Sequence, residues 1–309
     1  MFANCMWRCL LPFIIIPIYS INGQSRPAFS MPDSVMLFAE PYHYLKLVGP
    51  DYAQALPPAV DVNVGGCSFP SILPKGDLIA WGFIVAMDPQ RRRLARFALG
   101  VYFIAEQRWK TYGDFDDIGT TAFSPDGSRI AFVAEEPENR DALLILDIAT
   151  GKMTNALHPK GIPQRATLSW SPDGKRLVVE TQKSEKSSLI VVLDPNTGAA
   201  QPIGEGSDPA WSPTGEWIAY YDLPGKRCIL IHPDGTGTKS VGTSNSTLLS
   251  YRRFRYAAVW SPDGKKLLVN VMKGNLDTLD VMLLDLETGR STTKSKNGLP
   301  VFGWASRAK

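Results

Sequence analysis

Three aspartates recur at one place in a repeated motif, and they are the first candidates for chemistry in this chain. Asp126, Asp173 and Asp263 each stand third in a Ser-Pro-Asp-Gly run. Carboxylates that recur from one repeat to the next are able to hold cations, because hard cations prefer carboxylate oxygens. The run itself needs the aspartate, since Pro fixes φ, Asp bonds back to the backbone and Gly accepts a positive φ. We therefore expect turns at these positions and predict no metal site from them.

Other residues with catalytic potential lack the spacing that catalysis requires. The chain has no G-x-S-x-G run of the kind that carries a nucleophilic serine. A glycine-rich run at 235–239 resembles a phosphate-binding loop, but we expect a turn between strands there and no helix after it. The histidines His43, His158 and His232 have no metal-ligand spacing, and His232 is expected to be a turn residue. We predict no catalytic residue, no cofactor and no metal, and hence no enzyme.

Arginine interleaved with aromatic residues forms basic clusters, which are the best candidates for binding. This composition is typical of protein interface hot spots, and it also suits an acidic or anionic sugar surface. The alternative is an ordinary solvated face of long side chains, and acidic residues at 135–138 weaken a uniformly positive field. A net charge of +3 is too small to indicate a nucleic-acid partner. We predict a protein partner with an acidic or envelope-associated surface, bound by Arg91, Arg92, Arg93, Arg165, Tyr251, Arg252, Arg253, Phe254, Arg255 and Tyr256.

The motif that carries the aspartates repeats four times along the chain. Its copies are AFSPDGSRIAFVA from Ala122, SWSPDGKRLVVET from Ser169, AWSPTGEWIAYYD from Ala210 and VWSPDGKKLLVNV from Val259. Roughly 20 to 25 residues after each first turn, a second apolar run enters a turn rich in Asp, Asn and Gly, which is a hairpin signal. Each unit therefore predicts four strands. A period of roughly 40 to 50 residues with this content indicates a β-propeller.

The predicted strands do not alternate between apolar and polar residues. The runs Ile130–Val133 and Leu189–Leu193 are apolar throughout. Strands buried on both faces have this pattern, and a blade between two neighbouring blades is buried in this way. We therefore expect the units to pack side by side. The turns that close each first and each second hairpin then lie on one face, and the variable connections with the basic clusters lie on the other.

Two incomplete copies decide how the ring is expected to close. A degenerate copy begins at Ile72, and the residues 302–304 supply only the first strand of a last copy. Segments 34–39, 44–48 and 58–62 are able to supply its three missing strands. We predict an all-β fold, a six-bladed β-propeller of four-stranded antiparallel blades whose last blade is closed by N- and C-terminal strands, which leaves no open edge in the ring. The alternative is a five-bladed ring with a loose leader at 24–65.

This phasing gives a single domain after a short leader. Residues 1–23 are predicted to be a signal peptide, and residues 24–309 a single β-propeller domain. Within it, residues 24–65 complete the last blade, blades one to five span 66–118, 119–164, 165–206, 207–254 and 255–297, and the closing strand spans 298–309.

The first residues carry the pattern of an exported protein. A short apolar run at Leu10–Ile18 is followed by small residues at Ser20 and Gly23, as in a secretory signal peptide. The run is too short and too rich in proline for a membrane span; an uncleaved anchor and a wrongly assigned start are the alternatives. We expect a periplasmic or secreted monomer without a stable membrane span after cleavage. Cys67 and Cys228 would remain in distant blades, so we expect buried thiols and no disulfide.

The SPDG unit, followed by Lys or Arg and an apolar run, resembles the repeat of TolB-type, WD-repeat-like propellers. The resemblance covers residues 66–309. It implies a six-bladed ring, an exported bacterial protein and, for TolB itself, a periplasmic partner-binding role beside the Tol–Pal envelope system. TolB carries an α/β domain before its propeller, whereas here the residues before the first repeat are assigned to ring closure. The resemblance therefore implies a TolB-like, non-catalytic protein-binding or scaffold module.

An enzyme at the mouth of the channel is the alternative function. Some six-bladed propellers of other families bind a metal in the channel and act as lactonases or sugar hydrolases. Such a site requires carboxylates that converge on the axis, for which Asp117 and Asp208 are the candidates. Stoichiometric Ca or Zn in purified protein would favour this alternative.

Overall fold

The computed structural model describes residues 34–39, 45–48, 70–87, 95–106, 108–136, 140–156, 162–163, 166–184, 187–222, 227–241, 256–272, 279–295 and 300–306. The chain divides into two compact units, Met1–Ser30 and Met31–Lys309, and every described residue belongs to the second. The described residues form strands and turns and contain no helix. Accordingly, no helix long and apolar enough to span a membrane occurs in this part of the chain.

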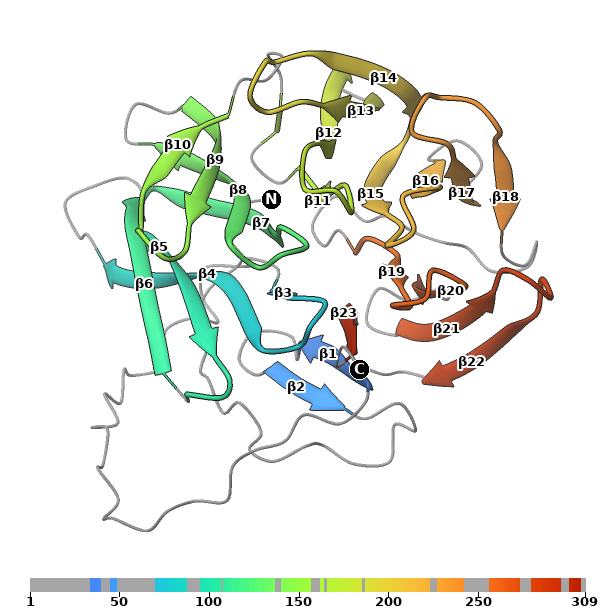
Figure 1. Cartoon of the computed structure of the whole chain (residues 1–309), viewed down its shortest axis with the longest axis horizontal. Coiled ribbons are helices and arrows are strands. Elements are labelled where there is room, and N and C mark those ends of the chain that lie inside the picture. The colour runs from blue at the N-terminus through green and yellow to red at the C-terminus, as the bar shows by residue number, and fades with distance from the viewer. Residues whose placement is uncertain are drawn as a thin grey trace, which may run out of the picture. The chain divides into compact units, whose positions relative to one another are not determined.

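Five sheets have four antiparallel strands each, and in all five the strands pair in chain order (Figure 1). Sheet 1 consists of β3 (Ser71–Ile72), β4 (Leu78–Met87), β5 (Ala95–Phe103) and β6 (Arg108–Phe115). Sheet 2 consists of β7 (Asp117–Phe123), β8 (Arg129–Glu136), β9 (Arg140–Asp147) and β10 (Met153–Asn155). Sheet 3 consists of β11 (Leu168–Trp170), β12 (Leu177–Ser184), β13 (Ser187–Leu193) and β14 (Ala200–Glu205).

The last two of these sheets repeat the same order. Sheet 4 consists of β15 (Ser207–Trp211), β16 (Ile218–Asp222), β17 (Arg227–Ile231) and β18 (Lys239–Val241). Sheet 5 consists of β19 (Val259–Trp260), β20 (Lys266–Met272), β21 (Leu279–Asp285) and β22 (Ser291–Ser295). The prediction of an all-β chain built from four-stranded antiparallel units is confirmed.

A sixth sheet, here called the terminal sheet, joins both ends of the described chain. Its strands are β1 (Ser34–Ala39), β2 (Leu45–Val48) and β23 (Val301–Ser306), in the order β2-β1-β23. The pairing of β1 with β23 is antiparallel and places Val35 opposite Ala305. The fourth strand expected at 58–62 lies outside the described residues.

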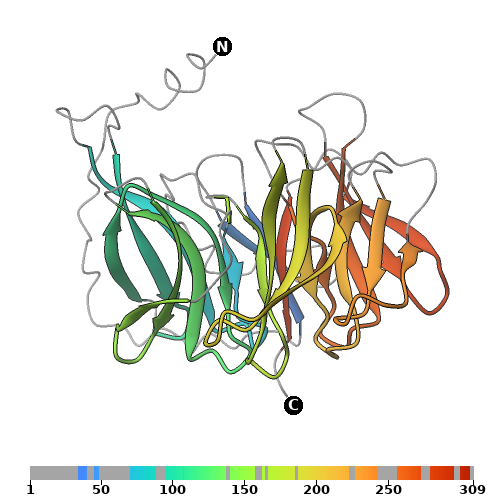
Figure 2. The ribbon, with the colours of Figure 1, turned by 90° about the horizontal axis from the view of Figure 1, so that it is seen from above.

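The SPDG runs form the turns between the first two strands of sheets 2, 3 and 5, and the related SPTG run does so in sheet 4. In each turn the glycine N–H donates to the serine carbonyl three residues earlier, for example Gly127 to Ser124 at 2.9 Å. The glycine has a positive φ, which is 76° at Gly127 and 66° at Gly174. Figure 2 shows these short turns along one side of the sheets. This side is here called the turn face.

Apolar side chains on both faces of sheets 2, 3 and 4 form much of the core. Val178 and Val179 are neighbours on β12 and are both fully buried. Val178 packs with Ile218 in the cluster between sheets 3 and 4, while Val179 packs with Val133 in the cluster between sheets 2 and 3. Successive strand residues point to opposite faces, so a strand with two covered faces is apolar at every position. Each fully buried aliphatic side chain of this kind contributes about 1.5–3 kcal/mol.

Polar contacts also join neighbouring sheets. The indole N–H of Trp170 donates to the carbonyl of Ala122 in sheet 2 at 3.1 Å. The indole N–H of Trp260 donates to the carbonyl of Ala210 in sheet 4 at 3.0 Å. Both indoles are buried, and the hydrogen bonds satisfy their only polar atoms. These tryptophans belong to the inter-blade core, as predicted.

The innermost strands of successive sheets contact each other in sequence order. β7 contacts β3 and β11, β15 contacts β11 and β19, and β23 contacts β19 and β3. A backbone hydrogen bond joins the last contact, because Ser306 N–H donates to the Pro74 carbonyl at 2.9 Å. On the other side of β23, Asn270 of sheet 5 exchanges two hydrogen bonds with the backbone of Val301, at 3.1 and 2.9 Å. Side chains as well as backbone therefore connect the terminal sheet to sheets 1 and 5.

Candidate functional site

The recurring aspartates are bound within their own turns. The hydroxyl of Ser124 donates to the carboxylate of Asp126 at 2.6 Å, and the backbone N–H of Ser128 donates to the same carboxylate at 3.1 Å. Asp173 and Asp263 repeat this arrangement with Ser171 and Ser261. Side-chain hydrogen bonds from Ser124 and Ser128 lower the pKa of Asp126 to about 2. These carboxylates stabilise turns, which confirms their predicted structural role.

Asp208 is the more unusual of the two channel-mouth candidates. Its side chain has no exposed surface, and its φ of 57° lies in a region that side-chain-bearing residues rarely adopt. Its carboxylate accepts hydrogen bonds from the hydroxyls of Thr167, which directly precedes β11 of sheet 3, and of Ser207, both at 2.9 Å. Its backbone N–H points to the carboxylate of buried Glu180 at 3.4 Å. Asp208 is thus a buried connection between sheets 3 and 4.

The second candidate, Asp117, lies at the start of β7 in sheet 2. One of its carboxylate oxygens accepts a hydrogen bond from the N–H of Ile118 at 2.8 Å. The two candidates therefore belong to different sheets. The carboxylate of Asp117 binds the adjacent Ile118, whereas that of Asp208 binds Thr167 and Ser207. The described residues contain no group of three or more His, Cys, Asp or Glu side chains placed to hold a metal ion.

Beside Asp208 lie two further buried groups, Tyr221 and Cys228 of sheet 4. Burial raises the pKa of Tyr221 well above its usual value, and the negative charge of Asp208 adds to this shift. Burial raises the pKa of the Cys228 thiol to about 12. A thiol held in this protonated state is a poor nucleophile. Cys228 is free and buried, as predicted, whereas Cys67 lies outside the described residues.

Of the predicted partner-binding residues, Tyr256 alone lies in the described part of the chain. Arg91, Arg92, Arg93, Arg165, Tyr251, Arg252, Arg253, Phe254 and Arg255 lie outside the described residues. Tyr256 is described and half-buried, and its ring packs edge-on against Phe302 of β23 with a centroid distance of 5.1 Å. The aromatic end of this cluster is therefore anchored on the terminal sheet.

The predicted turn role of His232 is confirmed, and the structure adds a partner. The turn places Nδ1 of His232 2.9 Å from the carbonyl of Glu216. Its ring stacks on Trp217 with a centroid distance of 3.9 Å and an interplanar angle of 25°. The glycine run 235–239 leads from the turn at 233–235 into β18, which begins at Lys239, and no helix follows it there. His43 and His158 lie outside the described residues.

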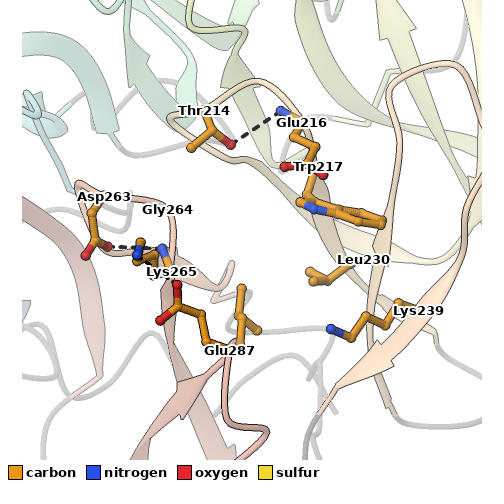
Figure 3. A pocket seen from close by; sticks show the side chains of 10 residues that line it. Thr214, Glu216, Trp217, Leu230, Lys239, Asp263, Gly264, Lys265 and Glu287 are labelled. Atoms are coloured by element: carbon orange, nitrogen blue, oxygen red, sulfur yellow. Dashed lines mark hydrogen bonds and ion pairs between the residues drawn. The ribbon is translucent and has the colours of Figure 1, made fainter.

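A hollow of about 290 Å³ lies on the turn face between sheets 4 and 5 (Figure 3). Trp217 and Leu230 line its sheet 4 side, and Figure 3 shows the turn that carries Lys265 across from them. Lys265 forms an ion pair with Glu287 at 2.7 Å, and that hydrogen bond raises the pKa of Lys265. This hollow was not predicted from the sequence, because it lies between two turns that are far apart along the chain.

Aromatic residues of sheet 1 form a second feature that was not predicted. Trp109 of β6 packs edge-on against Trp81 with a centroid distance of 4.1 Å and lies 4.6 Å from Tyr102. Trp109 is 37% exposed, whereas Trp81 and Tyr102 are buried. Its members come from the three strands β4, β5 and β6, so these strands had to be aligned before the cluster could be recognised.

Comparison with known proteins identifies the architecture. The model of the TolB beta propeller domain matches residues 114–296. The chain belongs to this family. No curated protein matches it in sequence.

Solved structures show the same fold at low sequence identity. TolB from Acinetobacter baumannii superposes with a TM-score of 0.67 and 17% identity, over 88% of this chain and 66% of that chain. The chain thus spans slightly less than two thirds of that TolB. A chain of the nidogen/laminin complex gives a TM-score of 0.59 at 12% identity, over 88% of this chain and 97% of that chain. Oligogalacturonate lyase from Vibrio parahaemolyticus gives 0.55 at 12% identity, over 76% and 70%.

Proposed function

We propose that this TolB-type propeller is an exported, non-catalytic module that binds a protein partner. The proposal rests on the carboxylates of the turns and of Asp208, which are hydrogen-bonded to groups of the protein itself. The turn aspartates are bound by their own turns, and Asp208, which the enzymatic alternative needs at the channel, is fully buried and accepts two hydroxyl hydrogen bonds. The solved structures of similar fold include a chain of the nidogen/laminin complex and an oligogalacturonate lyase. The fold by itself therefore favours neither a binding module nor an enzyme.

The proposal includes a ring of six blades, with the terminal sheet as the sixth. In support, β23 contacts the innermost strands of both sheet 5 and sheet 1. Gly303 of β23 lies so close to Ile72 that a Cβ there would come within 2.3 Å of its Cγ2 atom. Such a close approach suits a strand that packs as the neighbour of sheet 1. The fourth strand of this blade, expected at 58–62, lies outside the described residues.

The partner is proposed to bind on the variable face, opposite the turn face. A rigid scaffold of sheets that supports variable connections is a common arrangement for recognition. Tyr256, at the end of the basic aromatic cluster, is held on Phe302 of the terminal sheet. A partly exposed aromatic ring fixed in this way loses little entropy on binding, which favours an anchor role. Acidic partner groups would pair with the arginines of the same cluster.

Affinity capture from an envelope extract tests this surface. The wild type is compared with the triple variant Arg252→Ala, Arg253→Ala, Arg255→Ala, which is expected to lose the partner. The matched control removes three positive charges from exposed positions at or near the turn face, with Lys152→Ala, Lys175→Ala and Lys239→Ala. If the control loses the same partner, the binding is a general charge effect and the proposed face is wrong.

Export is tested separately. The leader 1–23 lies outside the described residues, and the TolB family relationship favours an envelope location. Mass spectrometry of the protein recovered from periplasmic extract is expected to show a mature N-terminus after Ser20 or Gly23. An intact Met1 in the soluble cell fraction would contradict export.

A further inference from the structure

Among the described residues, the outer strand of each of sheets 1 to 5 has one edge that pairs with no further strand, so five such edges can be compared. Proteins usually protect edges with short strands, proline or charged and polar residues. β10 and β18 have three residues each, β14 contains Pro202, and β22 is a polar strand with Lys294. β6 has eight residues and no proline, and beside the charged Arg108, Lys110 and Asp114 it contains Trp109, Thr111 and Tyr112, which all favour strands.

The exposed residues of β6 are also organised. Trp109 lies over Gly100 of β5, where an added Cβ would be 3.6 Å from its ring, and it packs against Trp81 and Tyr102. Among the described residues, Trp109 and Val85 are the large hydrophobic side chains that are exposed. The ring of Trp109 is therefore fixed before any partner arrives, so that binding would cost little side-chain entropy.

The opposite side of the same strand is basic. Because strand residues alternate, Arg108 and Lys110 point to the face away from Trp109. Arg108 stacks on Phe103 at 4.0 Å and pairs with Glu106, and both partners of this pair are about half exposed. The Lys110 ammonium lies 4.8 Å from the ring of Tyr112 and donates to the carbonyl of Ile148 at 3.4 Å. An exposed ion pair of this kind contributes little, so an incoming carboxylate is able to replace Glu106.

We propose that β6 is a docking edge for an extended acidic segment of a protein partner, which adds to sheet 1 as a fifth strand. Between Arg108 and Tyr112, alternate backbone N–H and C=O groups point away from β5, and a strand added there would bind them. Its acidic residues would face Arg108 and Lys110, and its apolar residues would cover Trp109. The two positive charges disfavour a second copy of β6 and favour an acidic strand. This surface is separate from the variable face.

A fluorescent eight-residue peptide of alternating glutamate and valine tests the edge, with fluorescence anisotropy of the full chain as the readout. The expected result is saturable binding that weakens at least roughly tenfold when lysine replaces glutamate in the peptide. Two further peptides are methylated on the backbone nitrogens of either the glutamates or the valines. One set of nitrogens faces β6, so one methylated peptide should lose binding and the other retain it.

Protein variants locate the site. Trp109→Thr and the pair Arg108→Glu, Lys110→Glu should each weaken binding at least roughly tenfold. The matched control, Arg290→Glu with Lys294→Glu, makes the same charge change at the edge of sheet 5 and should leave affinity unchanged. Trp109→Tyr keeps an aromatic ring and should retain binding, which guards against a folding defect in Trp109→Thr.

Several results would overturn the docking edge. They are equal binding of the acidic and basic peptides, retention by both methylated peptides, loss in the sheet 5 control, or a dimer in sedimentation velocity that Trp109→Thr dissociates. The dimer would assign the edge to a second copy of this chain. The triple arginine variant of the variable face should bind the peptide as the wild type does. The proposal for one surface can therefore fail without affecting the proposal for the other.

Discussion

Asp126 and Asp208 differ in where the hydrogen-bond donors of their carboxylates come from. Asp126 binds Ser124 and Ser128, which are two residues away. Asp208 binds Thr167, which is 41 residues away, directly before the first strand of the neighbouring sheet. The first arrangement depends on local chain geometry, whereas the second requires two sheets to pack correctly. The two carboxylates should therefore respond differently to substitution and to pH.

Replacement of Asp126 by Thr should make stability less dependent on acid. The pKa of Asp126 is about 2 in the folded protein and about 3.9 when unfolded, so its contribution is present above about pH 4 and is lost as the pH falls towards 2. Asp126→Thr should cost less than about 1 kcal/mol at pH 7, since the turn is exposed. The difference from wild type should shrink between pH 5 and pH 2, as measured by urea unfolding.

The SPTG turn of sheet 4 supplies the control for this change. Thr214 takes the place of the aspartate there, and its hydroxyl lies 3.1 Å from that of Ser212. Thr214→Asp should introduce the acid dependence that Asp126→Thr removes. A stability difference that stays constant from pH 5 to pH 2 in both variants would contradict the role assigned to the turn carboxylates.

Asp208→Ala should be much more destabilising. It would leave the buried hydroxyls of Thr167 and Ser207 without their acceptor and would place alanine at a positive φ, with an expected cost of roughly 2–4 kcal/mol. Asp208→Asn keeps an acceptor oxygen and tolerates this backbone conformation, so it should lose less than half as much. Denaturant unfolding measures both. If Asp208→Ala were as stable as the wild type, the hydrogen bonds of Asp208 would not hold sheets 3 and 4 together.

At the scale of the elements, arginine side chains next to the turn of one sheet contact the neighbouring sheet. Arg129, just after the turn of sheet 2, places its guanidinium 4.6 Å from the ring centroid of Trp170. It also donates to the carbonyl of Gly174 at 2.8 Å. Arg176 repeats the stacking on Trp211 at 5.1 Å. The same turn that closes a hairpin therefore also sets the distance to the neighbouring sheet.

Arg129→Lys should weaken this inter-sheet contact while the charge is kept. Lysine lacks the planar group that stacks on Trp170 and donates to Gly174, so we expect a loss of about 1 kcal/mol in the free energy of unfolding. Lys175→Arg changes an exposed residue of the next turn and should change stability by less than about 0.5 kcal/mol. Equal effects of the two variants would mean that the stacking contributes nothing.

At the scale of the whole molecule, the proposed ring depends on the pairing of the two ends of the chain. Val35 of β1 lies opposite Ala305 of β23. Residues directly opposite in an antiparallel pair have Cα atoms about 4.5–5.5 Å apart, which is within disulfide range.

Val35→Cys with Ala305→Cys should therefore form a disulfide under oxidising conditions. The expected gain is about 4 kcal/mol, because the bond closes a very long loop of the unfolded chain. Cys5, Cys9 and Cys67 are replaced by serine so that the new pair is alone apart from buried Cys228. Mass spectrometry and thermal unfolding with and without reductant provide the readout. Free thiols after oxidation would contradict the closure and favour five blades.

Much of the fold could be predicted because its signals are local or periodic. The SPDG runs set the turns through contacts within five residues, and the repetition of these runs along the chain is enough to predict the four-stranded units. The apolar runs such as 189–193 indicated burial on two faces. The role of the turn aspartates followed from the same local chemistry, since the atoms that bind them are fixed by the covalent chain.

Only the tertiary structure decided which distant side chains meet. Asp208 with Thr167, Trp109 with Trp81 and the hollow beside Trp217 all depend on the register between strands or on the spacing between sheets. A shift of one residue in register turns a side chain to the other face, and such shifts occur at bulges like the one in β15 between Ser207 and Ala210. Residue order alone therefore determined the repeating unit, whereas packing between units determined its buried polar contacts and its exposed aromatic edge.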